Sequence, residues 1–277
     1  MTALPETTLL VTGATDGIGR QTALSLARRG ARVLVHGRTR AKAESTRDDL
    51  RTDSRSPHVE AVWGDLSSFA EVRALAAQVS ELAPRLDVLL NNAGVFMNER
   101  RLSPDGFELT FAVNHLAPFL LTHLLLPSLR ESPSPRVVNV SSVAHTRGAI
   151  DFDDLDLARR FDGYRAYAAS KLMNVLFSFD LARRLRSPLV AVNALHPGVI
   201  TTKLLREGFG STGASLESGA ATSLRLATDP ALAAVTGKYF SDQREATPAK
   251  MASDRALQER LYTVSARLTS VPPLPLS

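Results

Sequence analysis

The sequence predicts an α/β fold, a doubly wound parallel sheet of about seven strands with helices on both faces. Apolar segments typical of strands alternate with amphipathic segments typical of helices along the whole chain, which favours one such sheet over separate all-α and all-β parts. Several strand segments are near-continuous runs of Val and Leu, as expected for parallel strands covered on both faces. The first strand also runs through a glycine-rich turn directly into a helix, over residues 9–20.

The individual elements follow from these local patterns. Strands are expected at residues 8–12, 32–36, 59–64, 88–91, 137–141, 190–195 and 238–240. Helices are expected at 18–29, 40–51, 69–82, about 104–129, about 165–186, 216–227 and 254–268. No linker or internal repeat interrupts the series, so one domain is expected over residues 1–269. Two segments are predicted to be irregular: a mobile loop around Gly208, Gly210 and Gly213, and a proline-rich tail at 270–277 that is extended or disordered.

The composition excludes several classes of function. With 277 residues and 44% hydrophobic residues, the chain can bury a sizeable core, and without cysteine it has neither disulfides nor thiolate chemistry. The net charge of +5 comes from scattered arginines rather than from a basic stripe with aromatic residues, so no nucleic-acid partner is expected. No secretory signal is visible, and the most apolar stretch, 119–126, is too short to span a membrane. A cytoplasmic protein is therefore expected.

Tyr167 and Lys171 lie four positions apart in a predicted helix, which places a phenol and an ammonium group on the same face. A free phenol, with a pKa of about 10, is a poor acid–base catalyst near neutral pH. A cation within reach favours the phenolate and is expected to lower the tyrosine pKa towards the working pH. Because most pairs with this spacing are surface or packing residues, the pair alone is a weak signal.

Gly13, Gly17 and Gly19 follow the first strand and open a helix. Such a turn offers free backbone N–H groups and the positive end of a helix to a pyrophosphate. The spacing departs from the G-x-G-x-x-G dinucleotide fingerprint, because Thr15 and Ile18 occupy two of its positions. A glycine turn alone is often structural, but its place between a strand and a helix favours cofactor binding.

The turn and the Tyr–Lys pair together resemble the short-chain dehydrogenase/reductase family, over about residues 6–268. The resemblance implies a Rossmann-type fold with a cofactor half of about residues 1–140 and a catalytic and substrate half of about 141–269. It also implies hydride transfer between a nicotinamide and a carbonyl or alcohol carbon, without a metal. The implied cofactor-binding residues are Gly13, Thr15, Asp16, Gly17, Ile18, Gly19, Arg38, Asp65, Leu66, Asn92, Ala93, Gly94, Tyr167, Lys171, Pro197, Gly198, Val199 and Thr201.

The resemblance also assigns four catalytic residues, Asn114, Ser142, Tyr167 and Lys171. It implies that Tyr167 exchanges a proton with the substrate oxygen and that Ser142 polarises the carbonyl, with Ser141 as the alternative serine. Lys171 would lower the tyrosine pKa and hold the ribose hydroxyls. Asn114 would hold a water near the lysine and complete a proton relay.

The end of the second strand decides which nicotinamide nucleotide is expected. An acidic residue there would bind the ribose 2′-hydroxyl of NAD, but Gly37 occupies the position and Arg38 follows. A guanidinium suits a 2′-phosphate, so NADP(H) is the expected cofactor. The alternative is that Arg38 and Arg40 are solvated surface residues.

Two further residues near the site are expected to have structural roles. For Asn92 a structural role is expected at least as much as cofactor contact, and His196 is expected to pack or to bond to backbone.

Two segments place the chain within the family. Ser142 and Tyr167 are 25 residues apart, a long interval for this family. The insert at 151–163 and the carboxyl-terminal segment resemble the branch of retinol dehydrogenases, the WW-domain-containing oxidoreductase and protochlorophyllide reductase, although a chain without cysteine or anchor does not suit the last.

The aspartates of the insert favour a solvated loop over a calcium site, because the remaining EF-hand pattern is absent. Helices 104–129 and 165–186 could pair with a second subunit in a homodimer or homotetramer, unless the insert obstructs them.

The substrate is expected to be a hydrophobic aldehyde, ketone or alcohol, enclosed by a 200–215 loop that closes over it. Its predicted pocket is lined by Val95, Phe96, Val143, His145, Tyr164, Val199, Leu204, Leu205 and Phe209. The sequence thus predicts an NADP(H)-dependent oxidoreductase. Two other functions stay open: a cofactor-binding sensor or scaffold without turnover, and a dehydratase or epimerase of the same fold that recycles its cofactor.

Overall fold

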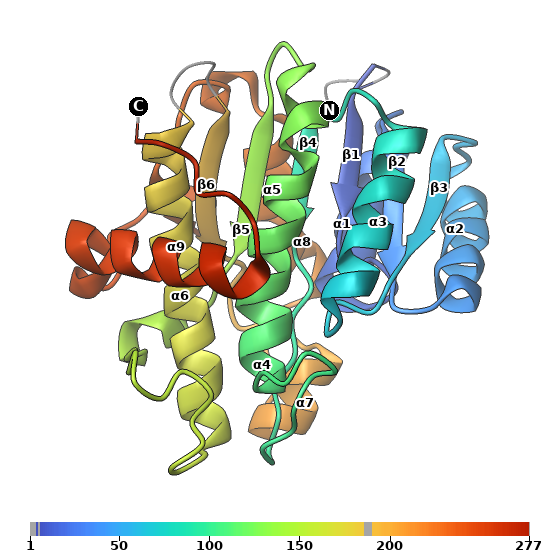
Figure 1. Ribbon diagram of the computed structural model, residues 1–277. Coiled ribbons are helices and arrows are strands. Elements are labelled where there is room, and N and C mark those ends of the chain that lie inside the picture. The colour runs from blue at the N-terminus through green and yellow to red at the C-terminus, as the bar shows by residue number, and fades with distance from the viewer. Residues whose placement is uncertain (1–3, 5, 186–189, 277) are drawn as a thin grey trace.

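The computed structural model describes residues 4, 6–185 and 190–276 and arranges them around one eight-stranded sheet (Figure 1). The strand order is β3-β2-β1-β4-β5-β6-β7-β8, and every neighbouring pair is parallel except β7 and β8. The strands are β1 (Thr8–Val11), β2 (Arg32–Gly37), β3 (Val59–Trp63), β4 (Val88–Asn91), β5 (Arg136–Val140), β6 (Ala191–His196), β7 (Lys238–Ser241) and β8 (Arg244–Glu245). The α-helices are α1 (Gly17–Arg28), α2 (Arg40–Ser54), α3 (Phe69–Leu82), α4 (Leu109–Phe111), α5 (Ala117–Arg130), α6 (Gly163–Arg184), α7 (Lys203–Phe209), α8 (Leu216–Thr228) and α9 (Arg255–Thr269).

The predicted doubly wound parallel sheet is confirmed. The chain builds outward from β1 to β3 and then returns to place β4 on the other side of β1, so the order reverses between these two central strands. Ligands of such sheets bind beyond the carboxyl ends of the strands at this reversal. The count of seven strands is one too low, because β8 has only two residues, Arg244 and Glu245, too few for a strand pattern.

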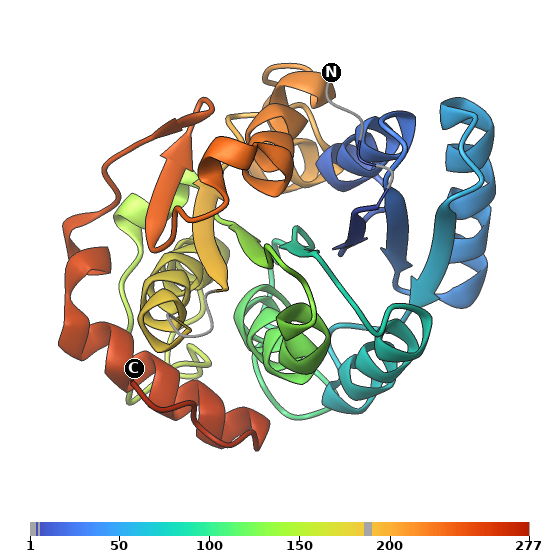
Figure 2. The ribbon, with the colours of Figure 1, turned by 90° about the horizontal axis from the view of Figure 1, so that it is seen from above.

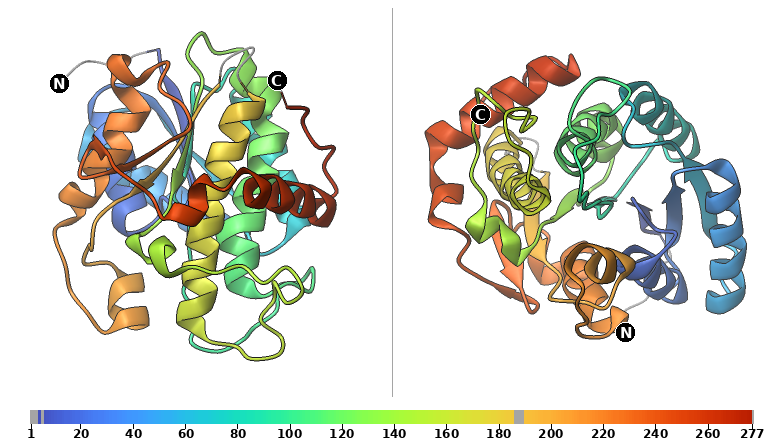
Figure 3. Two further views of the ribbon diagram at one scale, coloured as in Figure 1. Left: turned by 90° about the vertical axis from the view of Figure 1, so that its left-hand side faces the viewer. Right: turned by 90° about the horizontal axis from the view of Figure 1, so that it is seen from below.

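Helices cover both faces of the sheet, as Figures 2 and 3 show. One face carries α1, which packs against α2 and α8, and the other carries α3, α5 and α6. Each face has its own apolar layer: Leu26 and Leu226 belong to the first, and Phe119 and Phe177 to the second. The two layers hold the sheet rigidly, so that residues at its carboxyl edge keep fixed relative positions.

The predicted helix at 104–129 begins later and is interrupted. The carboxylate of Glu108 accepts hydrogen bonds from the backbone N–H groups of Thr110 and Phe111, at 2.9 and 2.8 Å, so the helix starts at Leu109 rather than at 104. A π-helical turn, Ala112–Leu116, then separates α4 from α5. Such turns are rare and often occur at functional sites, and this one carries Asn114.

The segment predicted as a loop around residues 208–213 contains a helix in its first part. The hydroxyl of Thr202 accepts a hydrogen bond from the backbone N–H of Leu205, which starts α7. Gly210 ends the helix in the left-handed conformation, with φ of 59°. Because α7 has only seven residues and includes Gly208, a weak helix former, its pattern is too short to stand out in the sequence.

The insert at 151–163 forms turns. Its carboxylates bind nearby backbone: Asp154 accepts hydrogen bonds from the N–H groups of Ala158 and Arg159, at 2.7 and 3.2 Å. Asp156 accepts one from the N–H of Glu108 at 2.6 Å and so joins the insert to the start of α4. Within the described ranges, no group of three or more His, Cys, Asp or Glu side chains could hold a metal ion.

Helix α9 lies across α5 and α6, the two helices that were candidates for pairing with a second subunit (Figure 2). After α9 the tail has no helix or strand, as predicted; Val271 is buried and Leu274 is half-buried, whereas residues 272, 273, 275 and 276 are exposed. The backbone N–H of Leu274 donates a hydrogen bond to the hydroxyl of Tyr262, which also pairs with Nε2 of His123 on α5. The predicted last residue of helix 165–186 lies outside the described residues.

One described stretch, Leu109–Arg130, is long and apolar enough to cross a membrane by length and composition. In the fold, 83% of its most apolar window is buried inside the protein. Core helices often meet the same criteria, so this feature is weak evidence for a span. From the sequence, the apolar stretch at 119–126 was expected to be too short for a span. The helical stretch is longer than that because it begins ten residues earlier, at Leu109.

Candidate active site

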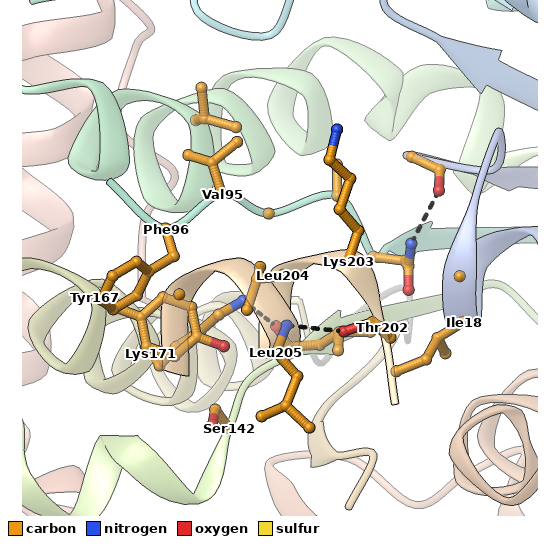
Figure 4. A pocket seen from close by; sticks show the side chains of 18 of the residues that line it. Ile18, Val95, Phe96, Ser142, Tyr167, Lys171, Thr202, Lys203, Leu204 and Leu205 are labelled. Atoms are coloured by element: carbon orange, nitrogen blue, oxygen red, sulfur yellow. Dashed lines mark hydrogen bonds between the residues drawn. The ribbon is translucent and has the colours of Figure 1, made fainter. Parts of the chain in front are cut away.

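A cavity of about 1090 Å³ lies beyond the carboxyl ends of the central strands (Figure 4). The glycine turn after β1 and the ends of β2, β3 and β4 form one wall, which we call the cofactor wall. Val95 and Phe96, the segment after β5, Val199, the start of α6 and helix α7 form the other, which we call the substrate wall. Of the cofactor-binding residues predicted from the sequence, every one except Thr201 lines this cavity.

The glycine turn brings bare backbone to the cavity. Gly13 and Gly17 have φ values of +63° and +55°, which L side chains rarely adopt. A Cβ atom at Gly19 would lie 2.3 Å from the carbonyl oxygen of Gly13 and 2.4 Å from the side-chain nitrogen of Asn92. The turn therefore forms a cradle in front of the amino terminus of α1, of the kind that binds a pyrophosphate.

Hydrogen bonds from neighbouring strands fix this cradle. Asn92, after β4, donates from its side chain to the carbonyl oxygen of Thr12 at 2.9 Å, which gives it the structural role expected for it. His36, on β2, accepts a hydrogen bond from the N–H of Gly13 at 3.1 Å and donates one to the carbonyl oxygen of Gly64 at 2.9 Å. Burial lowers the pKa of His36, so the ring is neutral and can play both parts at once. No pattern in the sequence had pointed to His36 as part of the site.

The adenosine end of the cavity has no acidic side chain at position 37, and the packing shows why. A Cβ atom at Gly37 would lie 2.8 Å from a methyl carbon of Thr15 and 3.0 Å from the backbone nitrogen of Ala43. Arg38 lines the cavity, and no described residue forms a hydrogen bond or ion pair with its side chain. Arg40, in contrast, pairs with Glu44 and does not line the cavity.

Tyr167 and Lys171 lie side by side on α6 (Figure 4). Nζ of Lys171 donates a hydrogen bond to the carbonyl oxygen of Val140 at 2.9 Å and lies 5.6 Å from the centroid of the Tyr167 ring. Burial raises the pKa of Tyr167 to about 12, and burial lowers the pKa of Lys171 to about 8. The expected lowering of the tyrosine pKa is therefore wrong for the protein groups alone, because desolvation outweighs the opposing hydrogen bond from Ser142.

The two candidate serines have different surroundings. The hydroxyl of Ser141 is buried and donates to the carbonyl oxygen of Lys171 at 2.7 Å. The oxygen of the Ser142 hydroxyl accepts a hydrogen bond from the N–H of Ala144 at 3.2 Å, so its proton is directed to another partner. A hydrogen bond between the side chains of Ser142 and Tyr167 opposes the rise in the tyrosine pKa. Ser142 is therefore the serine placed for chemistry, as the sequence analysis preferred.

Asn114 lies behind the cavity wall rather than in it. Its amide oxygen accepts a hydrogen bond from the N–H of Val95 at 2.8 Å, and its amide nitrogen donates to the carbonyl oxygen of the same residue at 2.9 Å. A Cβ atom at Gly94 would lie 3.3 Å from Nζ of Lys171 and 3.4 Å from the amide oxygen of Asn114. Gly94 thus lets the lysine and the asparagine approach each other, although the water expected between them stays a prediction.

The substrate wall is aromatic and aliphatic. Phe96 lies 5.6 Å from Tyr167 and 4.8 Å from Phe209, measured between ring centroids, and Leu204 of α7 packs beside them. Eight of the nine predicted pocket residues line the cavity, namely Val95, Phe96, Val143, Tyr164, Val199, Leu204, Leu205 and Phe209. The exception is His145, which is buried behind Ser142.

The segment after β6 differs from its prediction at one residue. Pro197, Gly198 and Val199 line the cavity as expected. The hydroxyl of Thr201 instead donates to the carbonyl oxygen of Gly213 and accepts from its N–H, both at 2.8 Å. Thr202 lines the cavity in its place, and no signal in the sequence distinguished these two adjacent threonines.

Comparison with known proteins agrees with this geometry. The family model described as short chain dehydrogenase matches residues 7–210, which include both the glycine turn and the Tyr–Lys pair. The chain belongs to the short-chain dehydrogenase/reductase family. Human retinol dehydrogenase 13 is 43% identical to it, in an alignment that covers 97% of this chain and 86% of that protein. Members of the family are oxidoreductases that bind NAD(P).

Solved structures show the same fold. An uncharacterized protein from Mycobacterium paratuberculosis matches with a TM-score of 0.84 and 32% identity, covering 100% of this chain and 97% of that one. A short chain dehydrogenase from Escherichia coli CFT073, complexed with NADPH, matches with a TM-score of 0.74 and 28% identity, covering 87% and 98%. The branch expected from the insert and the carboxyl-terminal segment agrees with the retinol dehydrogenase relatives.

Proposed function

We propose that this short-chain dehydrogenase/reductase is NADP(H)-dependent and transfers a hydride between the nicotinamide and a carbonyl or alcohol carbon of a hydrophobic small molecule. Tyr167 acts as the general acid in reduction and as the general base in oxidation. One observation carries the proposal: Ser142, Tyr167 and Lys171 converge where the apolar substrate wall meets the glycine cradle. The cradle, whose backbone at Gly13 and Gly19 lines the cavity, fits a dinucleotide.

The protein's own groups supply position and protons, while the cofactor, when bound, supplies or accepts the hydride. Because the pKa of Tyr167 is about 12, its hydroxyl is protonated at neutral pH and donates to the substrate oxygen during reduction. Lys171, held by the carbonyl of Val140, is largely charged below pH 8 and stabilises the phenolate that remains. Ser142 donates a hydrogen bond from its hydroxyl to the same substrate oxygen and polarises the carbonyl.

The preference for NADP(H) rests on charge and space at the adenosine end. Arg38 faces the cavity without a partner among the described residues, so its guanidinium is available to a 2′-phosphate. Crowding around Gly37 disfavours the carboxylate that would bind a 2′-hydroxyl. The NADPH complex of the Escherichia coli structure supports the same choice.

The substrate class follows from the substrate wall. Phe96, Leu204 and Phe209 present apolar surface around the hydroxyl groups of Ser142 and Tyr167, so a hydrophobic body with one polar reacting group fits best. The names of the relatives point to an apolar alcohol, retinol. We therefore extend the proposal to aldehydes, ketones and alcohols with long or cyclic apolar bodies.

The proposal is tested by NADPH oxidation with a panel of hydrophobic aldehydes and ketones, including retinal. Wild type and Tyr164→Phe are expected to turn over, whereas Tyr167→Phe is expected to lose activity by about 10²–10⁴-fold. Tyr164 is the matched control because it lines the same cavity and also contacts Phe209. Tight NADPH binding without turnover of any compound would favour a sensor or scaffold, and product formation without net NADPH consumption would favour a dehydratase or epimerase.

A further inference from the structure

Two histidines hold the peptide group that follows Ser142, one at each end. Nδ1 of His145 lies 2.7 Å from the carbonyl oxygen of Ser142. Nδ1 of His196 lies 3.2 Å from the N–H nitrogen of Val143, which belongs to the same peptide group. The two rings come from different elements, because His145 is in the 3-10 turn Val143–Arg147 and His196 ends β6.

The partners of each ring fix which nitrogen carries the proton. A carbonyl oxygen only accepts, so Nδ1 of His145 must donate to Ser142, and its Nε2 accepts the backbone N–H of Ala249 at 3.0 Å. Nδ1 of His196 must accept, because the N–H of Val143 only donates. A neutral His196 therefore carries its proton on Nε2, and the two histidines hold opposite tautomers.

The surroundings keep both rings neutral. Burial lowers the pKa of His145, which lies 4.8 Å from the ring of Tyr239. Burial also lowers the pKa of His196 to about 4, although the carboxylate of Asp242 opposes the change. Both hydrogen bonds require a neutral histidine ring. At neutral pH the two rings are neutral and Tyr167 is protonated, so the histidine contacts and the proton donor are present together.

This double contact bears directly on the Ser142 hydroxyl. The side-chain oxygen of Ser142 is held by the N–H of Ala144, two residues along the same turn. With the peptide after Ser142 held at its carbonyl and at its N–H, rotation of this backbone would break at least one of the two hydrogen bonds. Its hydroxyl is thereby aimed at the point where Tyr167 also meets the cavity.

We propose that His145 and His196 are positioning residues that clamp the Ser142–Val143 peptide and so aim the Ser142 hydroxyl at the substrate oxygen. The catalytic consequence rests on the proposed oxidoreductase function, whereas the clamp itself does not. Misplacement of a reacting group by about 1 Å can lower a rate by about 10²-fold. Loss of the clamp should therefore lower kcat while the cofactor wall, and with it the affinity for NADPH, is unchanged.

The kinetic test compares two substitutions at the same position. His196→Asn keeps an acceptor at the reach of Nδ1, whereas His196→Leu removes it at similar size. His196→Leu is expected to lower kcat by about tenfold to a hundredfold, with KM and the dissociation constant of NADPH within about twofold of wild type. His196→Asn is expected to restore most of that loss. Equal kcat values for the two variants, at equal melting temperature, would overturn the inference.

A second measurement does not depend on turnover. Nitrogen NMR of protein labelled with [¹⁵N]histidine reports which ring nitrogen is protonated in each of the 6 histidines, and single His→Asn variants assign the signals. At pH 7 the expected result is Nδ1–H for His145 and Nε2–H for His196. The Nδ1–H form is the less favoured tautomer of a free histidine, so its observation at His145 is discriminating.

The two measurements separate the two proposals. Opposite tautomers to those expected, or a charged His196 at neutral pH, would overturn the clamp whatever the enzyme does. The expected tautomers together with no turnover of any carbonyl would leave the clamp standing and count against the proposed function. The expected tautomers with a kcat loss that His196→Asn restores would support both.

Discussion

The two walls of the cavity are built in different ways. The cofactor wall consists of backbone and small residues, and its turn is tied to neighbouring strands through Asn92 and His36. The substrate wall consists mainly of large side chains, and part of it is the short helix α7, which has no buried residue. Phe209 is 37% exposed there and Val199 is 51% exposed. Hydrogen bonds hold the cofactor wall, whereas contacts between side chains hold the part of the substrate wall that α7 forms.

The difference indicates which wall can vary. A wall made of backbone presents a fixed surface to a fixed ligand, and a new side chain in it meets atoms that cannot move. A wall of partly exposed side chains can change its shape by substitution without breaking the fold. We therefore expect substitutions in the cofactor wall to have large effects on cofactor binding, and substitutions in the substrate wall to have small effects that depend on the substrate.

The largest effect is expected from Gly19→Ala. In an ordinary helix this change would stabilise by about 1 kcal/mol, but here the new Cβ would lie 2.3 Å from the carbonyl oxygen of Gly13. We expect NADPH binding, measured by fluorescence titration, to weaken by at least about hundredfold, because the cradle must open to admit the methyl group. Gln21→Ala, in the same helix, is the control and should bind NADPH as wild type does. Unchanged binding in Gly19→Ala would contradict the rigid cofactor wall.

A second, smaller effect is expected from Arg38→Asp. The change removes a charge-assisted hydrogen bond of about 1.5–3 kcal/mol to the 2′-phosphate and places a carboxylate near it. The ratio of kcat/KM for NADPH to that for NADH is expected to fall by about hundredfold. Arg40→Asp is the matched control, because Arg40 pairs with Glu44 and does not line the cavity. If both variants changed the ratio equally, Arg38 would be acting only as part of a general positive field.

The cofactor wall was also the part that the sequence predicted best. Its glycines at 13, 17 and 19 and the residues 92–94 follow strands directly, and the carboxyl ends of parallel strands lie at one edge of a sheet. The relative position of Tyr167 and Lys171 was predicted equally well, because a spacing of four residues on one helix leaves the two side chains little freedom. The family resemblance supplied these assignments, and short-range geometry within regular elements explains why the structure places the residues as expected.

The substrate wall was predicted less well, since its details depend on long-range packing. Helix α7 is too short to show the hydrophobic period of a helix. Thr201 and Thr202 are adjacent and alike, and only the local turn decides that Thr201 bonds to Gly213 while Thr202 lines the cavity. The tyrosine pKa was predicted in the wrong direction, because burial of Tyr167 cannot be read from the spacing of two residues. His145 was expected in the cavity, and its actual contact with Ala249 joins segments 104 residues apart.

The pH dependence of reduction tests the catalytic residues Tyr167 and Lys171, which lie where the two walls meet. Reduction requires a protonated Tyr167 and a charged Lys171, whose pKa values are about 12 and about 8. We expect kcat/KM for carbonyl reduction to be constant below pH 8 and to fall about tenfold per pH unit above it, as Lys171 loses its proton. The measurement is a pH–rate profile from about 6 to about 10. Lys171→Arg keeps its charge, so its profile should lack this fall. A rate that rises with pH would show that the lysine charge is not required.

The smallest effect is expected from Phe209→Ala in the substrate wall. Phe209 contacts Phe96 and Tyr167 at centroid distances of 4.8 and 5.6 Å, yet it remains 37% exposed, so its loss leaves the fold intact. An aromatic contact contributes about 0.5–1.5 kcal/mol, so KM should rise about threefold to tenfold for bulky apolar substrates and little for small aldehydes. Leu82→Ala, at a similarly exposed residue outside the cavity, is the control. A change in NADPH affinity as large as the change in KM would mean that the two walls are coupled, and the separation between a fixed cofactor wall and an adaptable substrate wall would not hold.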